Sequence, residues 1–170
     1  MTMLNRRRFL AGLGVLGGGA LLGLGPSLSR RDAVHAAAVD VDKLQLSDAQ
    51  WRERLTKAQF HILREEGTEP PGSSPLLKEK RKGQFICAGC ELPLFESATK
   101  YESGTGWPSF WDGIDGHIGT KSDYKLFMKR TEYHCARCGG HQGHVFDDGP
   151  RPTGLRYCNN GLALNFVPAA

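Results

Sequence analysis

Apolar and polar residues alternate along short runs in the second half of this chain. The runs "GQFICAGC" and "TEYHCARC" each predict a short strand that leads into a turn carrying two cysteines. In "YKLFMKR" the alternation predicts a single strand with Tyr124, Leu126 and Met128 on one face. In "LALNFV" it places three residues together on one face, Leu162, Leu164 and Phe166. Glycine-rich connections separate these runs, and no long helical period occurs among them.

Residues 39–66 instead have the spacing of a helix. Ser47 and Gln50 form a capping box before the apolar face that begins at Trp51, and Gly67 ends the helical pattern. We therefore predict a mainly β domain of the α+β class. It consists of a small antiparallel, barrel-like sheet with a helical N-terminal arm packed on it.

The N-terminal segment has the order of a secretion signal. The arginines of "NRRRFL" precede a weakly hydrophobic, glycine-rich run, and the small residues of "AVHAAA" complete it. The paired arginines resemble a twin-arginine (Tat) export signal, although Asn5 stands where Ser or Thr is commoner. We predict a cleaved signal over residues 1–36, a short linker over 37–43 and the folded domain over 44–170.

A transmembrane anchor is the alternative for this segment. The apolar run is shorter than the roughly 18 residues that a span needs, and its glycines lower the hydrophobicity. No cysteine that could carry a lipid lies near the cleavage zone. We expect cleavage after Ala36 or Ala38, export by the Tat machinery to a bacterial periplasm, and no permanent membrane anchor.

The net charge of +4 belongs to the predicted signal. Residues 1–36 hold five Arg and one Asp of the chain's 22 basic and 18 acidic residues, which leaves 17 of each sign in the remainder. A neutral mature domain gives no electrostatic reason to bind nucleic acid, and we expect no nucleic-acid partner.

Four of the five cysteines come as two CxxC pairs, Cys87 with Cys90 and Cys135 with Cys138. Two such turns can place four thiolates around one soft divalent ion, which predicts a closed, structural zinc site with one Zn²⁺ per chain. Disulfides are the alternative in an exported protein, although a disulfide within a CxxC turn is strained and redox-active.

The fifth cysteine, Cys158, has no internal partner if the other four bind metal. A buried, inert thiol is the common state of such a cysteine. Its neighbours instead indicate a reactive thiol. Arg156 would favour a thiolate, and Asn159 and Asn160 are unusual choices for a core.

Two further groups accompany these cysteines. His141 and His144 follow the second CxxC pair in "GGHQGHVFDDG", where a metal-bound turn would hold them in place. Trp107, Phe110 and Trp111 lie in the loop "GTGWPSFW". These aromatic residues predict either an exposed binding surface or a cap on the core.

The segments "EEGTEPP", "CAGCELPLF", "TKYESGTGWPSF" and "CARCGGHQGHVFDDGPRPTGLRYCNNGLAL" together resemble the methionine-R-sulfoxide reductase (MsrB) family over about residues 55–166. The resemblance implies a β domain with a four-cysteine zinc site. It also implies that Cys158 is the nucleophile and that His141, His144 and Asn160 are catalytic.

The resemblance likewise implies how the reaction proceeds. A thiolate that attacks a sulfoxide sulfur needs a proton donor for the departing oxygen, and His144 is expected to supply it while His141 and Asn160 orient the groups. Trp107 is expected to hold the substrate methyl group, and Arg156 is placed with it among the substrate-binding residues. The expected substrates are proteins or peptides that contain methionine-R-sulfoxide.

Recycling is expected to need a partner from outside the chain. Attack leaves Cys158 as a sulfenic acid, which many relatives reduce with a second cysteine in "GCGWPSF". Here Thr105 stands at that place. The sequence therefore predicts reduction by an external thiol, either a thioredoxin-like protein or a small molecule.

Two other functions fit part of the pattern. A zinc-stabilised binding module would use the aromatic loop and leave Cys158 silent. A disulfide oxidoreductase would use the CxxC pairs themselves.

Overall fold

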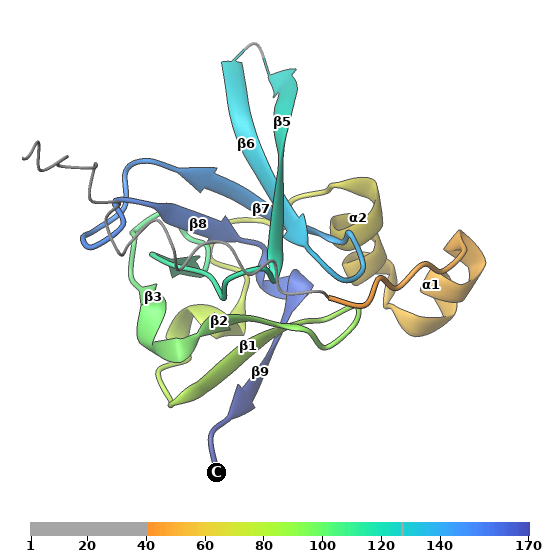
Figure 1. The fold of residues 1–170 in the computed structure, drawn as a ribbon, viewed down its shortest axis with the longest axis horizontal. Helices are drawn as coiled ribbons and strands as arrows, with labels where there is room; N and C mark the ends of the chain where they lie inside the picture. Colours follow the sequence, from red (N-terminus) through yellow and green to blue (C-terminus); the bar gives the residue numbers. More distant parts are fainter. Residues whose placement is uncertain (1–40, 127) are drawn as a thin grey trace, which may run out of the picture. The chain divides into compact units, whose positions relative to one another are not determined.

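Two antiparallel sheets make up most of the computed structural model, which describes residues 41–126 and 128–170 (Figure 1). The smaller sheet has the strand order β2–β1–β9, with bounds Pro93–Glu96, Gly83–Cys87 and Leu164–Pro168. The larger sheet has the order β3–β4–β8–β7–β6–β5, with bounds Lys100–Tyr101, Ser109–Phe110, Arg156–Asn159, His141–Phe146, Met128–Cys135 and Ile118–Leu126. The predicted fold class, mainly β with a helical N-terminal part, is confirmed. The predicted signal over residues 1–36 lies outside the described residues.

The helical stretch is shorter than predicted and is divided in two. Helix α1 spans Asp48–Arg54 and α2 spans Lys57–Glu65, and the residues from 41 to 47 are not helical. The predicted capping box of Ser47 and Gln50 is present at the start of α1. A second capping box at Thr56, which the sequence analysis missed, starts α2. Its cap residue takes an extended backbone conformation, and this separates the two helices.

The alternating run "YKLFMKR" is not one strand. Strand β5 ends at Leu126 and β6 begins at Met128, and these two residues pair across a hairpin. Alternation continues through a tight hairpin because both strands have the same two-residue period, so the pattern alone does not reveal the turn. Figure 1 shows that this hairpin extends beyond the other strands of the larger sheet.

The C-terminal run also differs from the prediction. The first two residues of "LALNFV" belong to the short 3-10 helix η4, Gly161–Ala163, and β9 begins only at Leu164. Leu162 is 38% exposed whereas Leu164 is 4% exposed, so the two side chains do not share a face. The tighter helical turn rotates Leu162 away from the core.

Aromatic side chains join the two sheets. The ring of Phe95 on β2 stacks on Phe110 of β4 at a centroid distance of 4.1 Å, and Phe85 meets the same ring edge-on at 4.9 Å. Phe110 is fully buried, so this member of the aromatic loop belongs to the core. Replacing a buried phenylalanine of this kind by alanine costs about 3–5 kcal/mol of stability.

The remaining short elements connect these parts. The 3-10 helices η2 and η3 span Pro75–Lys78 and Ser97–Thr99, and α2 packs against β7 and η4. Over the described residues, no helix combines the length and hydrophobicity that crossing a bilayer requires.

Candidate active site and metal centre

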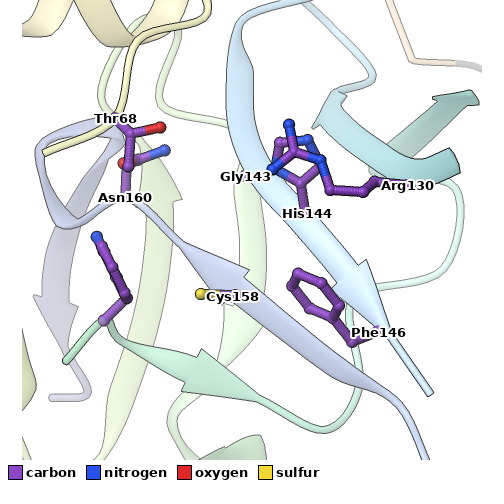
Figure 2. Close-up of a pocket in the computed structure, with 8 residues that line it drawn as sticks. Thr68, Arg130, Gly143, His144, Phe146, Cys158 and Asn160 are labelled. Carbon is purple, nitrogen blue, oxygen red and sulfur yellow. The ribbon is translucent and has the colours of Figure 1, made fainter. Parts of the chain in front are cut away.

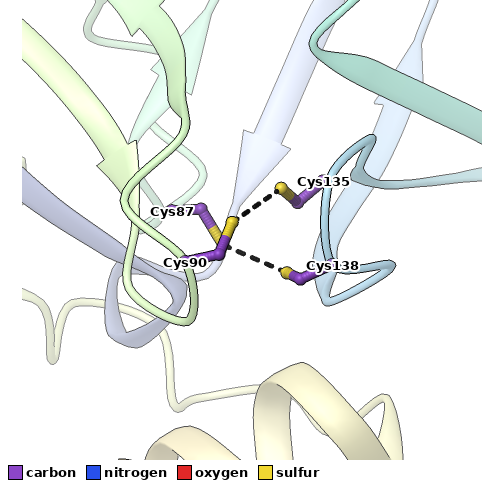
Figure 3. A group of neighbouring side chains, drawn as sticks. All are labelled: Cys87, Cys90, Cys135 and Cys138. Carbon is purple, nitrogen blue, oxygen red and sulfur yellow. Dashed lines mark hydrogen bonds between the residues drawn. The ribbon is translucent and has the colours of Figure 1, made fainter. Parts of the chain in front are cut away.

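The four paired cysteines form one cluster at the ends of β1 and β6. All four side chains are buried, and their sulfur atoms lie within 4.8 Å of one another (Figure 3). The Sγ atoms of Cys87 and Cys138 are 3.7 Å apart, and those of Cys90 and Cys135 are 3.4 Å apart. Tetrahedral ligands with metal–sulfur bonds of about 2.3 Å lie about 3.8 Å from each other. The cluster therefore has the donors and dimensions of a closed, four-coordinate metal site.

Main-chain and side-chain donors surround these sulfurs. The Gly140 N–H donates to Cys138 Sγ, and the side-chain amide of Gln142 donates to Cys87 Sγ, both at 3.4 Å. Hydrogen bonds with the Cys135 thiol lower the pKa of Cys90 and Cys138, whereas hydrogen bonds with the other cysteines raise the pKa of Cys87 and Cys135. Two of the four groups thus favour the thiolate, the form in which cysteine binds metal. All five cysteines are free in this structure.

The fifth cysteine lies in a row across the larger sheet. The Cα partners of successive strands are Ser109 on β4, Cys158 on β8, His144 on β7 and Glu132 on β6. Directly opposed residues of antiparallel strands share a face, so these polar side chains point to the same side. Gly143 permits the close approach of β7 to β8, because a Cβ there would lie 1.9 Å from the Cys158 carbonyl oxygen.

Cys158 opens into a pocket of about 170 Å³. Figure 2 shows it on β8 between Asn160 and Phe146. The lining residues are Thr68, Trp107, Arg130, Gly143, His144, Phe146, Cys158 and Asn160. Four of the predicted site residues are thus brought together: Cys158, His144, Asn160 and Trp107.

The Cys158 thiol is half-buried, and burial raises its pKa above the ordinary value. The charge of Arg156 and a hydrogen bond with Thr105 act in the opposite direction. Arg156 therefore favours the thiolate as predicted, but burial outweighs it and the net shift of the pKa favours the thiol. A base must remove the proton before Cys158 can act as a nucleophile.

Arg156 does not line the pocket. The residue is 8% exposed. Its guanidinium donates to both carboxylate oxygens of Asp148 at 2.8 Å and stacks on the Phe146 ring 4.3 Å from the centroid. Arg156 therefore lies against Phe146, and both its charge and a hydrogen bond lower the pKa of Cys158.

His144 is held by residues from the β5–β6 hairpin. Its Nε2 lies 2.7 Å from Asp123 Oδ2, and that oxygen also accepts from Arg130 Nη2 at 2.6 Å. Burial lowers the pKa of His144, while the hydrogen bond with Asp123 raises it. The lowered pKa leaves an imidazole that is neutral near pH 7 and can accept a proton.

His141 lies behind His144 instead of lining the pocket. It is 3% exposed, and its ring centroid is 5.7 Å from that of His144. Its Nδ1 lies 2.7 Å from Glu132 Oε1. Burial works against ionisation of Glu132, but hydrogen bonds with His134 and His141 lower its pKa to about 2. A buried carboxylate therefore fixes the orientation of His141.

Several site residues were missed by the sequence analysis. Thr68 and Phe146 line the pocket, Arg130 does so from the hairpin, and Asp123 contacts His144. Phe146 lies within the segment "GHVFDDG" two residues after His144, so alternation along a strand could have placed it on the same face. Asp123 carries no comparable signal, because only the hairpin register brings it to β7.

The SelR domain matches residues 55–168, which include both the fold and the pocket described above. The chain is therefore a member of the SelR-domain family. The relatives make the assignment more specific. The chain is 52% identical over 127 residues to "Peptide methionine sulfoxide reductase MsrB" of Agrobacterium fabrum, which covers 74% of this chain and 94% of that protein. A protein of the same name from Methanosarcina barkeri is 52% identical over 124 residues, covering 72% and 87% of the two chains. This chain belongs to the MsrB family of peptide methionine sulfoxide reductases.

Proposed function

We propose that this protein reduces the R epimer of methionine sulfoxide, in proteins or peptides, to methionine. The observation that carries the proposal is the pairing of Cys158 with His144 on adjacent strands at one small pocket. A non-catalytic binding module would need neither the thiol nor the ordered imidazole beside it, and that alternative is not favoured.

The reaction transfers one oxygen atom from the substrate to the enzyme. His144 takes the thiol proton of Cys158, and the resulting thiolate attacks the sulfoxide sulfur. This attack forms a bond between Cys158 Sγ and the substrate sulfur, and His144 returns the proton to the substrate oxygen, which leaves as hydroxide. Hydroxide then attacks Cys158 Sγ, the sulfur–sulfur bond breaks, and the thioether is released with both electrons of that bond. The sulfoxide is reduced to a thioether by two electrons, and Cys158 is oxidised to a sulfenic acid.

The neighbours of His144 suit it to this exchange. Asp123 lies 2.7 Å from Nε2, where its carboxylate would stabilise the imidazolium that forms when His144 takes the proton. The hydrogen bond leaves Nδ1 as the nitrogen that exchanges protons with the reacting groups. His141, fixed by Glu132, supports the His144 ring from behind.

The proposed choice of epimer would depend on the pocket walls. Trp107 and Phe146 offer aromatic surfaces for the methyl group, since sulfur-bound methyl groups pack well on aromatic rings. Asn160 and His144 line the same pocket, and we assign the sulfoxide oxygen to their side. Fixing the methyl group and the oxygen on different sides of a chiral sulfur selects one epimer.

Zinc is the metal that the cysteine cluster fits best. Cys87, Cys90, Cys135 and Cys138 would hold one Zn²⁺ with no open position, so the ion would stabilise the fold and take no part in the reaction. It would join β1 of the smaller sheet to β6 of the larger one.

Recycling of Cys158 requires an external thiol reductant. Thr105 stands close enough to hydrogen-bond Cys158, and it also lies 2.9 Å from the Ser103 hydroxyl. A threonine cannot form a disulfide, so two thiols from outside must reduce the sulfenic acid to thiol and water. The oxidised enzyme should contain a sulfenic acid and no internal disulfide, and Thr105→Cys should create one between positions 105 and 158.

The same proposal includes export of the protein to a periplasm by the Tat route, with cleavage of residues 1–36. The order of arginines, apolar run and small residues supports it. Replacing Arg6 and Arg7 by lysine should retain the protein in the cytoplasm. Continued export of that variant would exclude the Tat route.

The decisive experiment offers the enzyme resolved epimers of a methionine sulfoxide peptide with dithiothreitol as reductant. Wild-type protein should consume the R epimer and leave the S epimer. Cys158→Ser should consume neither while it retains its fold. Equal consumption of both epimers, or activity in Cys158→Ser, would contradict the proposed function.

A further inference from the structure

A buried carboxylate that the reaction does not use lies next to the pocket. Glu69 belongs to the loop between α2 and η2 and is 4% exposed. One of its oxygens accepts from the Gly161 N–H at 2.6 Å, and the other accepts from the Leu162 N–H at 3.0 Å. Hydrogen bonds to a charged acceptor are stronger than neutral ones, so this carboxylate fastens the turn that follows Asn160.

The main chain of Glu69 holds two pocket residues at the same time. Its N–H donates to Asn160 Oδ1 at 3.1 Å, and its carbonyl oxygen accepts from Trp107 Nε1 at 3.1 Å. Trp107 and Asn160 both line the pocket and come from segments about fifty residues apart. Through four hydrogen bonds, a single residue therefore ties one pocket wall to the other.

Close packing leaves this arrangement little freedom. A Cβ at Gly161 would lie 1.9 Å from Ser74 Oγ, and one at Gly106 would lie 2.8 Å from the side chain of Pro71. The Gly72 N–H also donates to the Gly106 carbonyl at 2.7 Å. The loop that carries Glu69 thus touches both the turn after Asn160 and the segment before Trp107.

We propose that Glu69 is a positioning residue that sets the separation of Trp107 and Asn160, and thereby the fit of the sulfoxide in the pocket. This inference rests on the proposed function. Because Glu69 contacts the binding walls and neither Cys158 nor His144, its loss affects substrate binding more than the chemical step.

The test is Glu69→Gln, which keeps the shape of the side chain. It replaces one acceptor oxygen by an NH₂ group, which cannot accept a hydrogen bond from the main-chain N–H that it faces. KM for the R-sulfoxide peptide should rise roughly tenfold, with a smaller change in kcat. The rate at which iodoacetamide labels Cys158 should stay as in wild type. Glu53→Gln, at an exposed position of α1, is the matched control and should leave all three quantities unchanged.

A readout independent of activity separates this inference from the proposed function. The indole N–H signal of Trp107 and the side-chain amide signals of Asn160 should shift in the ¹H–¹⁵N spectrum of Glu69→Gln and stay in place in Glu53→Gln. If Glu69→Gln is too unstable to study, Glu69→Asp, which is one methylene shorter, should show the same shifts. Unchanged signals, or an unchanged KM in a folded and active variant, would overturn the inference. Shifted signals in a protein whose wild type reduces neither epimer would instead reject the proposed function alone.

Discussion

The cysteine cluster and the Cys158 pocket both include residues from β6, β7 or the turn between them. The two regions differ in the burial and the neighbours of their sulfur atoms. In the cluster, four sulfurs are buried and face one another, at the ends of strands from two sheets. In the pocket, one half-buried sulfur faces a cavity beside an imidazole. Burial among other sulfurs suits a metal ion, whereas partial exposure beside a proton acceptor suits a reaction.

One residue connects the two regions. The side-chain amide of Gln142 donates to Cys87 Sγ, and its main-chain oxygen accepts from both the N–H and the side-chain amide of Asn160. Gln142 is fully buried between them. The position of a pocket wall therefore depends on the strand that the cluster anchors.

The largest expected effect comes from breaking the cluster. Cys87→Ser should lose the proposed zinc and the cooperative fold together, because metal binding of this kind contributes about 10 kcal/mol or more and a domain has only about 5–15 kcal/mol to lose. Metal content and thermal unfolding of the purified variant measure both. A folded, metal-free and active Cys87→Ser protein would mean that the cluster is dispensable.

Cys158→Ser should have an effect confined to the pocket. We expect activity to fall roughly a thousandfold or more, with metal content and unfolding temperature close to wild type. The hydroxyl of serine is a far weaker nucleophile than a thiolate. Unfolding of this variant would indicate that Cys158 is a core residue and would remove the contrast between the two regions.

A smaller effect is expected for Gln142→Leu, which removes the hydrogen bond to Cys87 Sγ. Contacts that orient metal ligands are typically worth about 10–100-fold in metal affinity. Zinc transfer to a chromogenic chelator should be roughly tenfold faster than in wild type. Gln45→Leu, at an exposed position, should transfer zinc at the wild-type rate.

The smallest effect concerns the pKa of Cys158. Because burial raises this pKa, the thiolate fraction is low at pH 7. The rate of labelling by iodoacetamide should therefore still increase with pH above pH 8.5, about the pKa of an ordinary thiol. Thr105→Val removes a hydrogen bond that lowers the pKa, so its labelling at pH 7 should be about threefold slower. A plateau below pH 7 would show that the resting state is already a thiolate.

Much of the cluster could be predicted from local sequence. Each CxxC turn follows a strand, and both the turn and the strand's alternation depend on residues within a few positions of each other. The same holds for the capping box at Ser47. The family motifs likewise indicated Cys158, His144, Asn160 and Trp107, all of which line the pocket.

The tertiary structure decided which distant groups support those residues. Asp123 meets His144 because the run after residue 123 forms a hairpin instead of one strand, and Glu69 meets Gly161 across 92 positions of the sequence. His141, although two positions from Gly143 of the pocket, turns inward to Glu132. Such contacts depend on strand register and loop packing, which a pattern of neighbouring residues does not specify, because hydrogen bonds between distant segments form only once the sheets have assembled.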